Sequence, residues 1–260
     1  MTTVDLAYSE FGHPDADPLI ILHGFFASSR NWKYIAEKLA VRQRIFVVDL
    51  RNHGASPHHP VMDYPSMAKD VRRFMEQRGF SHANLLGHSM GGKIAMWLAL
   101  NDPAAVDKLI VADIAPVTYS HSFEKTISAL KRLPLNSLSN RKQAEEILAE
   151  TIPDLSYRQF LLQNLILSGS HYQWRVNLDI FERMAPNITA FPGISEKLAF
   201  KKASLFIAGA DSNFVEEEAI QPLFPNAQLI MLANAGHWLH VQQQESFVMA
   251  VQNFLHKDSL

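Results

Sequence analysis

The 260-residue sequence predicts an α/β fold in which a mostly parallel, eight-stranded sheet is flanked by helices and carries an inserted helical cap. Two observations lead to this prediction. Short apolar runs of strand length alternate with segments of helical period, which is typical of parallel sheets. Between residues 115 and 202, helical patterns follow one another over a stretch too long for a loop in a compact domain. We therefore expect a core domain of residues 1–114 and 203–260, with residues 115–202 inserted as the cap.

The first half of the chain supplies most of the predicted sheet. Strands are expected at residues 4–11, 19–22, 44–49, 83–86 and 106–112, and helices at 31–40, 65–78 and 92–99. The continuous apolar run at 19–22 indicates a strand that helices cover on both faces. Pro65 suits the first turn of its helix, and Gly79 marks the end of that helix.

The second half begins with the predicted cap and returns to the core. Helical periodicity is present at residues 122–132, 141–150 and 156–167, with no strand expected between them. A strand at 203–209, a helix from Glu216, a last strand at 228–232 and a helix at 241–256 complete the core. We expect the apolar side chains of the cap to form its own core and a few of them to line an acyl pocket.

The motif Gly87-His88-Ser89-Met90-Gly91 lies between a predicted strand and a predicted helix. In that context a Gly-x-Ser-x-Gly sequence forms a sharp turn, the nucleophile elbow, which exposes the serine hydroxyl. The two glycines leave the room that such a turn requires. Ser89 is therefore the candidate nucleophile.

A serine hydroxyl is a weak nucleophile at neutral pH unless a base takes its proton. His237 follows the last predicted strand in a turn of small residues, and the chain order serine, acid, histidine suits this fold. His88 adjoins the serine and is expected to point away, while His240 already enters the final helix. We predict that His237 is the base.

Two carboxylates compete for the role of the acid that orients His237. Asp113 ends the strand that is expected beside the elbow strand. Asp211 follows the next strand, but it lies two residues beyond Gly209, where the acid usually lies three residues beyond, and Ser212 occupies that position. Because a shift of one residue in a turn redirects a side chain, we favour Asp113, with Ser212 as a supporting fourth member. Asp211 stays the alternative acid.

The loop after the second predicted strand contains His23, Gly24 and Phe25. A His-Gly pair at this place allows backbone N–H groups to turn towards the serine, so we predict an oxyanion hole formed by the N–H groups of Phe25 and Met90. His23, Gly24 and Trp238 are predicted to contact the substrate.

The composition excludes several other classes of protein. With 24 Lys and Arg against 26 Asp and Glu, the chain has no basic footprint for nucleic acid or for an anionic membrane surface. It has no cysteine, and its twelve histidines show no metal-ligand spacing, so we expect neither a metal nor a cofactor. No signal pattern or membrane-spanning run is present, which favours a cytoplasmic protein without stable membrane insertion. We expect it to be a monomer or a homodimer.

Four segments, at residues 49–54, 87–93, 113–116 and 209–215, resemble the α/β-hydrolase superfamily. The resemblance is to the families of YbfF-type bacterial esterases and of abhydrolase domain-containing protein 11. It implies the α/β-hydrolase fold and carboxylesterase activity on short acyl esters, thioesters included. It also implies an acid after the sixth strand of the fold, at Asp113, and a serine beside the histidine, at Ser212. These families carry asparagine just before that serine, whereas this chain has Asp211.

Together, the residues and the resemblance predict a serine carboxylesterase that hydrolyses short to medium acyl esters, or thioesters, through an acyl-enzyme intermediate. A small-molecule ester or thioester is the expected partner. Two alternatives remain open. The same residues could support carbon–carbon bond hydrolysis, amide hydrolysis or perhydrolysis, or the pocket could serve a receptor that binds a small molecule without turnover.

Overall fold

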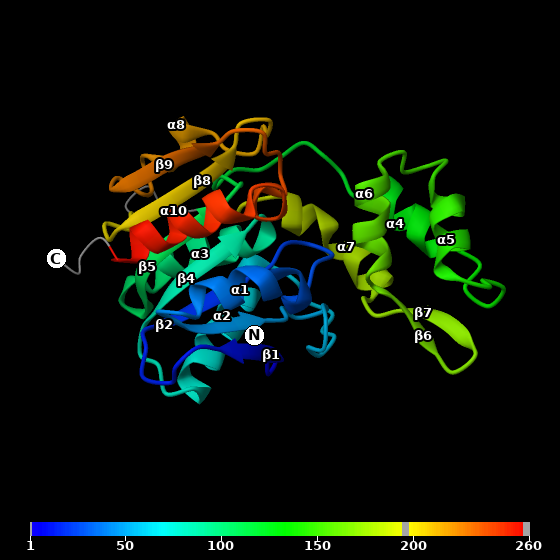
Figure 1. Cartoon of the computed structure of the whole chain (residues 1–260), viewed down its shortest axis with the longest axis horizontal. Helices are drawn as coiled ribbons and strands as arrows, with labels where there is room; N and C mark the ends of the chain where they lie inside the picture. Colours follow the sequence, from blue (N-terminus) through cyan, green and yellow to red (C-terminus); the bar gives the residue numbers. More distant parts are fainter. Residues whose placement is uncertain (1, 194–197, 257–260) are drawn as a thin grey trace.

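The structure is a computed structural model that describes residues 2–193 and 198–256 (Figure 1). Its main sheet, as far as these residues show, has seven strands in the order β1-β3-β2-β4-β5-β8-β9. β1 runs antiparallel to β3, and every other neighbouring pair is parallel. The strands of this sheet are β1 (Tyr8–Phe11), β2 (Pro18–Leu22), β3 (Arg44–Val48), β4 (Ala83–His88), β5 (Val106–Ala112), β8 (Ser204–Gly209) and β9 (Ala227–Leu232).

Helices cover both faces of the sheet, as the apolar strand patterns predict. Alternate residues of β2 enter separate hydrophobic clusters: Leu19 and Ile21 pack with α1 and α10, whereas Ile20 and Leu22 belong to the cluster that contains α2 and α3. The core helices are α1 (Lys33–Leu39), α2 (Tyr64–Gln77), α3 (Met90–Asn101), α8 (Glu217–Ile220), α9 (Leu239–Gln242) and α10 (Gln244–His256), with 3₁₀ turns η1 (Ser29–Trp32) and η2 (Pro103–Ala105).

The predicted count of eight strands is one too high for the main sheet as the described residues form it, and the strand before Asp113 is the fifth rather than the sixth. The expected first strand also begins late, at Tyr8. The preceding residues hydrogen-bond outside the sheet: the backbone N–H of Val4 donates to Asp70 Oδ1, and that of Ala7 donates to Ser56 Oγ. These bonds satisfy backbone groups that a longer strand would pair within a ladder.

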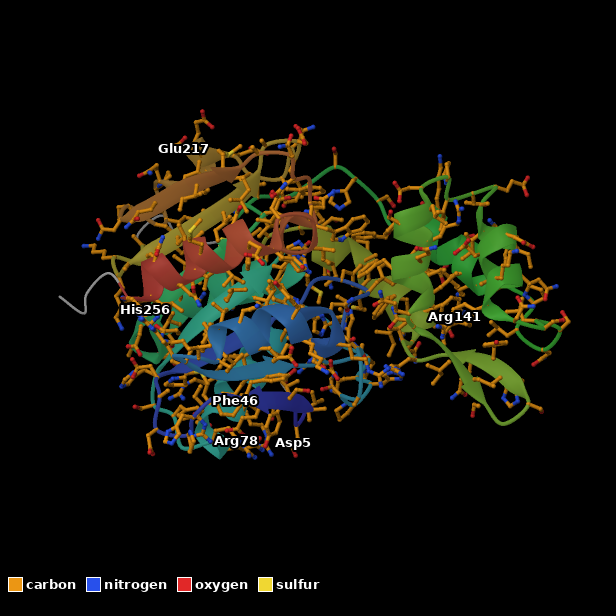
Figure 2. All side chains as sticks on the ribbon, in the orientation of Figure 1. Asp5, Phe46, Arg78, Arg141, Glu217 and His256 are labelled. Carbon is orange, nitrogen blue, oxygen red and sulfur yellow. The ribbon has the colours of Figure 1, made fainter. Side chains whose placement is uncertain are left out.

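Four helices and a β-hairpin lie between β5 and β8, on one side of the sheet (Figure 1). The helices are α4 (Glu124–Lys131), α5 (Arg141–Leu148), α6 (Leu155–Leu162) and α7 (Leu178–Thr189), and the hairpin strands are β6 (Leu165–Ser168) and β7 (His171–Trp174). Figure 2 shows Arg141 on this segment, where its Nη2 donates to the carbonyl oxygen of Leu165 at 2.6 Å and ties α5 to the hairpin. We keep the name cap for this segment. Of the predicted domains, residues 194–197 in the cap and residues 1 and 257–260 in the core lie outside the described residues.

The prediction of a cap made only of helices is wrong. The segment predicted as a helix at 156–167 ends as a helix at Leu162 and continues as strand β6. Gly169 has φ +61° at the turn between β6 and β7, a conformation that suits a two-residue hairpin loop. A short apolar run such as 165–167 fits either a helix or a strand, so periodicity alone could not distinguish them.

The register of the parallel strands brings their carboxyl ends to one edge of the sheet. Leu22 of β2 pairs with Gly87 of β4, and His88 pairs with Ala112 of β5. Ala112 in turn pairs with Ile207 of β8. The residues that follow β2, β4, β5 and β8 therefore meet at this edge, which is the usual place for a ligand site in a parallel sheet.

None of the described helices is long and apolar enough to cross a membrane.

Candidate active site

The elbow predicted from the sequence is present at the end of β4. Ser89 has φ +53° and ψ −120°, and α3 begins at the next residue. A Cβ atom on Gly87 would lie 2.2 Å from the carbonyl oxygen of Gly91, and one on Gly91 would lie 2.2 Å from that of Leu22. Only glycine fits at these two positions, so the two motif glycines allow the strained turn that holds Ser89 at the sheet edge.

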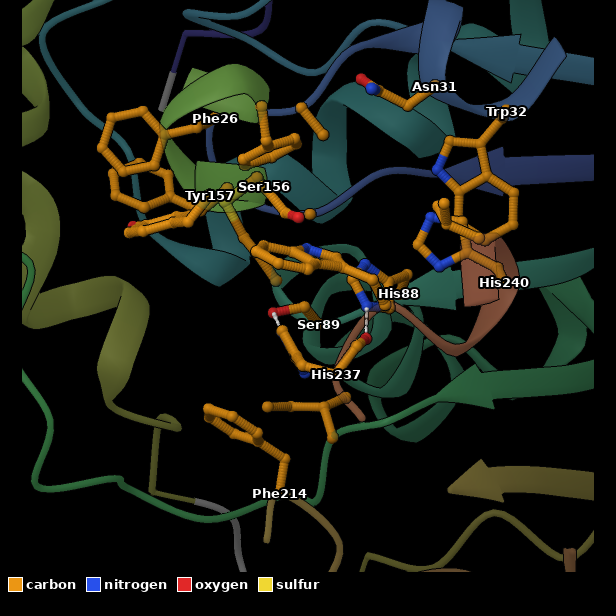
Figure 3. Close-up of a pocket in the computed structure, with 18 of the residues that line it drawn as sticks. Phe26, Asn31, Trp32, His88, Ser89, Ser156, Tyr157, Phe214, His237 and His240 are labelled. Atoms are coloured by element: carbon orange, nitrogen blue, oxygen red, sulfur yellow. Dashed lines mark hydrogen bonds between the residues drawn. The ribbon is translucent and has the colours of Figure 1, made fainter. Parts of the chain in front are cut away.

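Three of the predicted site residues lie in one series of contacts. The Oγ atom of Ser89 lies 3.1 Å from Nε2 of His237 (Figure 3). Nδ1 of His237 lies 2.8 Å from Oδ2 of Asp113. Asp113 is fully buried, whereas the side chain of His237 is 26% exposed. A buried carboxylate on Nδ1 fixes the ring so that Nε2 is free to accept the serine proton.

Asp113 also receives hydrogen bonds from the end of β8. Its Oδ1 accepts from the backbone N–H of Gly209 at 3.0 Å, and its Oδ2 accepts from the hydroxyl of Ser212 at 2.5 Å. Asp211 is exposed, and its backbone N–H donates to the carbonyl oxygen of Ala235. The structure therefore brings Asp113 to His237 and Ser212 to Asp113, whereas the exposed Asp211 side chain contacts neither of them.

The loop after β2 lies against the elbow. The backbone N–H of Ala27 donates to the carbonyl oxygen of Gly24, which closes a turn with Phe26 at φ +62°. Within the described part of the chain, the N–H groups of Phe25 and Met90 have no hydrogen-bond acceptor. Both residues line the cavity beside Ser89, so their N–H groups are available for an oxyanion.

The prediction that His23 contacts the substrate is wrong. His23 is fully buried and does not line the cavity. Its Nδ1 donates to the carbonyl oxygen of Gly24 at 2.8 Å, and its Nε2 accepts from the N–H of Leu50 at 3.0 Å. Because both ring nitrogens are hydrogen-bonded, His23 holds the loop after β2 against the start of the loop after β3. Gly24 and Trp238, the other two predicted contacts, do line the cavity.

The cavity above Ser89 has a volume of about 810 Å³ and lies between the core and the cap. None of the described residues that line it is an aspartate or a glutamate. Nine aromatic side chains from both parts of the chain line it: Phe25, Phe26, Trp32, Tyr119, Phe123, Tyr157, Phe160, Phe214 and Trp238. The sequence indicated Trp238, but nothing in the pattern of α6 marked Tyr157 and Phe160 as lining residues, because their proximity to Trp238 depends on how the cap packs.

Burial lowers the pKa of two side chains that line the cavity, His240 and Lys93. Burial lowers the pKa of His240 to about 3, and the neighbouring His237 adds to this shift. The His240 ring stacks on Trp32 with 4.3 Å between ring centroids. Burial likewise lowers the pKa of Lys93 to about 7, although its Nζ donates to the carbonyl oxygens of Thr189 and Ala190. Lys93 thereby ties α3 to the end of α7.

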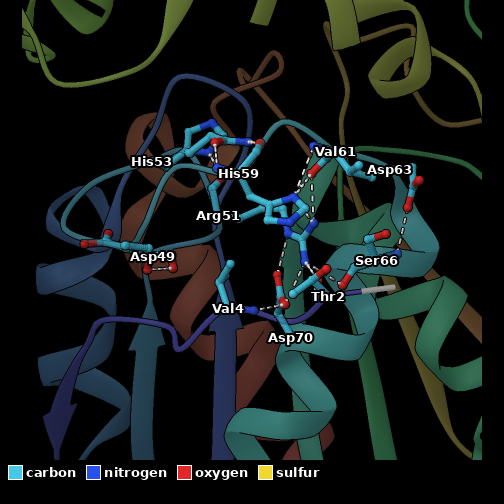
Figure 4. A network of polar contacts seen from close by, with 12 residues as sticks. Thr2, Val4, Asp49, Arg51, His53, His59, Val61, Asp63, Ser66 and Asp70 are labelled. Atoms are coloured by element: carbon cyan, nitrogen blue, oxygen red, sulfur yellow. Dashed lines mark hydrogen bonds and ion pairs between the residues drawn. The ribbon is translucent and has the colours of Figure 1, made fainter. Parts of the chain in front are cut away.

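The loop after β3 is fixed by a buried ion pair (Figure 4). Arg51 and Asp70 form two parallel hydrogen bonds, of 2.6 Å from Nε and 2.8 Å from Nη2. Asp49 accepts from the backbone N–H groups of Ser29 and Ala55. All four carboxylate oxygens of Asp49 and Asp70 accept hydrogen bonds from this loop or from neighbouring segments. The two aspartates therefore have a structural role.

The parallel sheet and the strained turn at Ser89 define an α/β protein, and the contacts from Ser89 through His237 to Asp113 lie at the carboxyl edge of its sheet. Its family follows from comparison with known proteins. The chain belongs to the α/β hydrolase family, since the family model described as "alpha/beta hydrolase fold" matches residues 17–244.

Several relatives cover nearly the whole chain. The protein named sn-1-specific diacylglycerol lipase ABHD11 of Xenopus laevis is 36% identical, over 97% of this chain and 84% of its own length. Esterase YbfF of Escherichia coli K12 is 33% identical, over 92% of both chains. Among solved structures, one titled "Marine microorganism esterase" is 37% identical with a TM-score of 0.92, and the match covers 97% of this chain and all of the other. The resemblance inferred from the motifs is therefore confirmed.

Proposed function

We propose that this protein is a serine carboxylesterase that hydrolyses short to medium acyl esters, and thioesters of the same acyl groups, through an acyl-enzyme intermediate. The observation that carries the proposal is the series of contacts from Ser89 through His237 to Asp113. The names of the relatives, esterase and diacylglycerol lipase, support ester hydrolysis as the reaction.

In the first half of the reaction, Ser89 Oγ attacks the ester carbonyl carbon while Nε2 of His237 takes the hydroxyl proton. The carbonyl oxygen becomes an oxyanion, and the N–H groups of Phe25 and Met90 are proposed to bind it. When the tetrahedral intermediate collapses, the bond to the leaving alcohol or thiol breaks. His237 returns its proton to that leaving group, and the acyl group stays on Ser89.

In the second half, a water molecule attacks the acyl carbon. His237 takes one proton of the water and passes it to Ser89 Oγ as the acyl bond breaks, which releases the carboxylic acid. Asp113 stabilises the imidazolium form in both halves, and Ser212 supports Asp113 through its hydroxyl. Every step uses side chains and backbone groups of this chain.

The cavity supports the proposed range of acyl groups. Its aromatic wall and its volume of about 810 Å³ suit an apolar acyl chain of moderate length. No carboxylate among the described lining residues would repel an acidic product. We therefore expect turnover to rise from acetyl to medium acyl lengths and to fall once the chain outgrows the cavity.

The test is hydrolysis of p-nitrophenyl esters from acetate to dodecanoate by the parent and by Ser89→Ala, with fluorophosphonate labelling of both. We expect the parent to turn over and to be labelled, and Ser89→Ala to lose both activities. A parent that is labelled but turns over none of these esters would favour amide, carbon–carbon or peroxide chemistry at the same residues. A parent that neither reacts with the probe nor turns over would favour a receptor.

A further inference from the structure

His88, the residue before the candidate nucleophile, makes a direct bond to the candidate base. It was expected to point away from the site, but its Nε2 lies 2.8 Å from the backbone carbonyl oxygen of His237 (Figure 3). Because a carbonyl oxygen can only accept a hydrogen bond, Nε2 of His88 must carry the proton and donate it. The residue that precedes Ser89 thus holds the backbone of the residue whose ring contacts Ser89.

The surroundings of His88 keep this donor in place. His88 is 4% exposed, and its ring lies 4.8 Å from that of His237 and 4.5 Å from that of His240. Phe214 lies on the other side of His237, with 4.3 Å between ring centroids (Figure 3). Burial, with further contributions from His240 and His237, holds the pKa of His88 well below its usual range. The ring is therefore neutral at physiological pH, with a single N–H.

This bond links two segments that the sheet holds apart. The elbow follows β4 and the His237 loop follows β9, and β5 and β8 lie between these strands. Among the described residues, the bond from His88 is the single hydrogen bond from an elbow side chain (residues 87–91) to the backbone of the loop at 233–238. Asp113 also holds the ring of His237, and the backbone N–H of Asp211 bonds to Ala235 in the same loop, while the bond from His88 ties the backbone of that loop to the elbow.

We propose that His88 is a positioning residue that sets the distance between Ser89 and His237 through its bond to the His237 backbone. The inference rests on the proposed function and deepens it. Loss of the donor would let the His237 loop move relative to the elbow, while the parts of the cavity wall supplied by α6 and by the loop after β2 stay in place. A displacement of about 1 Å between reacting groups can cost roughly 10²-fold in rate. We therefore expect the loss of the His88 donor to lower kcat and to leave KM nearly unchanged.

The experiment compares His88→Leu, His88→Asn and His88→Gln with the parent, by kcat and KM on p-nitrophenyl butyrate and by thermal unfolding. Leucine removes the donor, asparagine carries an amide that is too short to reach the carbonyl, and glutamine places its amide nitrogen near the position of Nε2. Tyr64→Phe is the matched control, because it removes another buried bond from a side chain to a backbone carbonyl, from the Tyr64 hydroxyl to Ile188, away from His237.

We expect His88→Leu and His88→Asn to lose about 10- to 100-fold in kcat with KM changed less than about threefold, and His88→Gln to recover most of kcat. Tyr64→Phe should lower the unfolding temperature and leave kcat near that of the parent. Parental kcat in His88→Leu, or equal kcat in the Asn and Gln variants, overturns the proposal. If His88→Leu does not fold, the Asn and Gln pair decides the question. Absence of Ser89-dependent turnover in the parent would instead reject the proposed esterase function.

Discussion

The ends of β5 and β8 lie side by side in the sheet, and each carries an aspartate, but only one of the two aspartates reaches His237. Asp113 follows β5 directly, is fully buried and has φ +51°. Asp211 lies two residues beyond β8 and is exposed. The residue after it, Ser212, is the one that turns inward and bonds to Asp113.

This difference teaches that the position of a carboxylate relative to the strand end decides its role more than its place in the chain order does. The left-handed backbone at Asp113 directs its side chain towards β8 and His237 as soon as β5 ends. After β8, the side chain that points towards Asp113 is that of Ser212, three residues after Gly209. The two strand ends thus share the support of one histidine: β5 supplies the charge, and β8 supplies donors to that charge.

The largest expected effect is that of Asp113→Asn. An amide keeps the shape but presents the wrong partner to His237 Nδ1, so the ring loses the tautomer that accepts the serine proton. We expect kcat on p-nitrophenyl butyrate to fall by about 10⁴-fold, with KM little changed. Steady-state kinetics on the folded variant measure the effect. A loss of less than tenfold would mean that Asp113 is not the acid.

The second prediction moves the carboxylate from one strand end to the other. In the double variant Asp113→Asn with Ser212→Asp, the new carboxylate starts from a position whose Oγ lies 2.5 Å from Asp113 Oδ2. We expect it to restore roughly 10- to 100-fold of the activity that Asp113→Asn alone loses, because it can again orient His237. Asp113→Asn with Asp211→Glu is the control. Recovery in the control but not in the test variant would show that Asp211, rather than Ser212, faces the histidine.

The third prediction concerns the donor at β8 in the presence of Asp113. Ser212→Ala removes one of the hydrogen bonds to the buried carboxylate and leaves those from Gly209 and His237. A hydrogen bond to a charged group contributes about 1.5–3 kcal/mol, part of which the other donors retain, so we expect kcat to fall by about tenfold. Ser212→Thr keeps the hydroxyl and should stay close to the parent. Equal losses in the Ala and Thr variants would point to packing instead of the hydrogen bond.

Much of the fold followed from local patterns. The strands β2 to β5 and the elbow lie where apolar runs and the Gly-x-Ser-x-Gly motif predicted them, because parallel strands buried on both faces and a strained turn each impose a clear local pattern. The hairpin β6–β7 did not follow, since a short apolar run such as 165–167 fits either a strand or a helix. The main sheet has seven strands rather than eight, and the seven ranges predicted for it each correspond to one of them. The first of these strands begins later than expected because the residues before Tyr8 bond to Asp70 and Ser56 rather than to a neighbouring strand.

The site divides in the same way. The contacts among Ser89, His237 and Asp113 agree with the expectations from motif and strand order. Two histidines differ from the expectations: His23 is buried and bonds to Gly24 instead of contacting the substrate, and His88 bonds to His237 instead of pointing away from the site. The direction of a histidine ring at a strand end depends on which carbonyl or N–H group the neighbouring loops present. That is settled by tertiary packing and leaves no local signal in the sequence.

The smallest expected effect is that of Asp211→Asn, which tests whether the aspartate that follows β8 has any role in catalysis. The side chain of Asp211 is exposed, and its backbone N–H, which bonds to Ala235, is unaffected by the substitution. Interactions between solvent-exposed charges are weak because water screens them, so we expect kcat and KM to change by less than about twofold. Kinetics at low and at high salt, beside Asp113→Asn, measure the effect. A large loss of kcat at both salt concentrations would place the acid after β8 and reverse the assignment of the two strand ends.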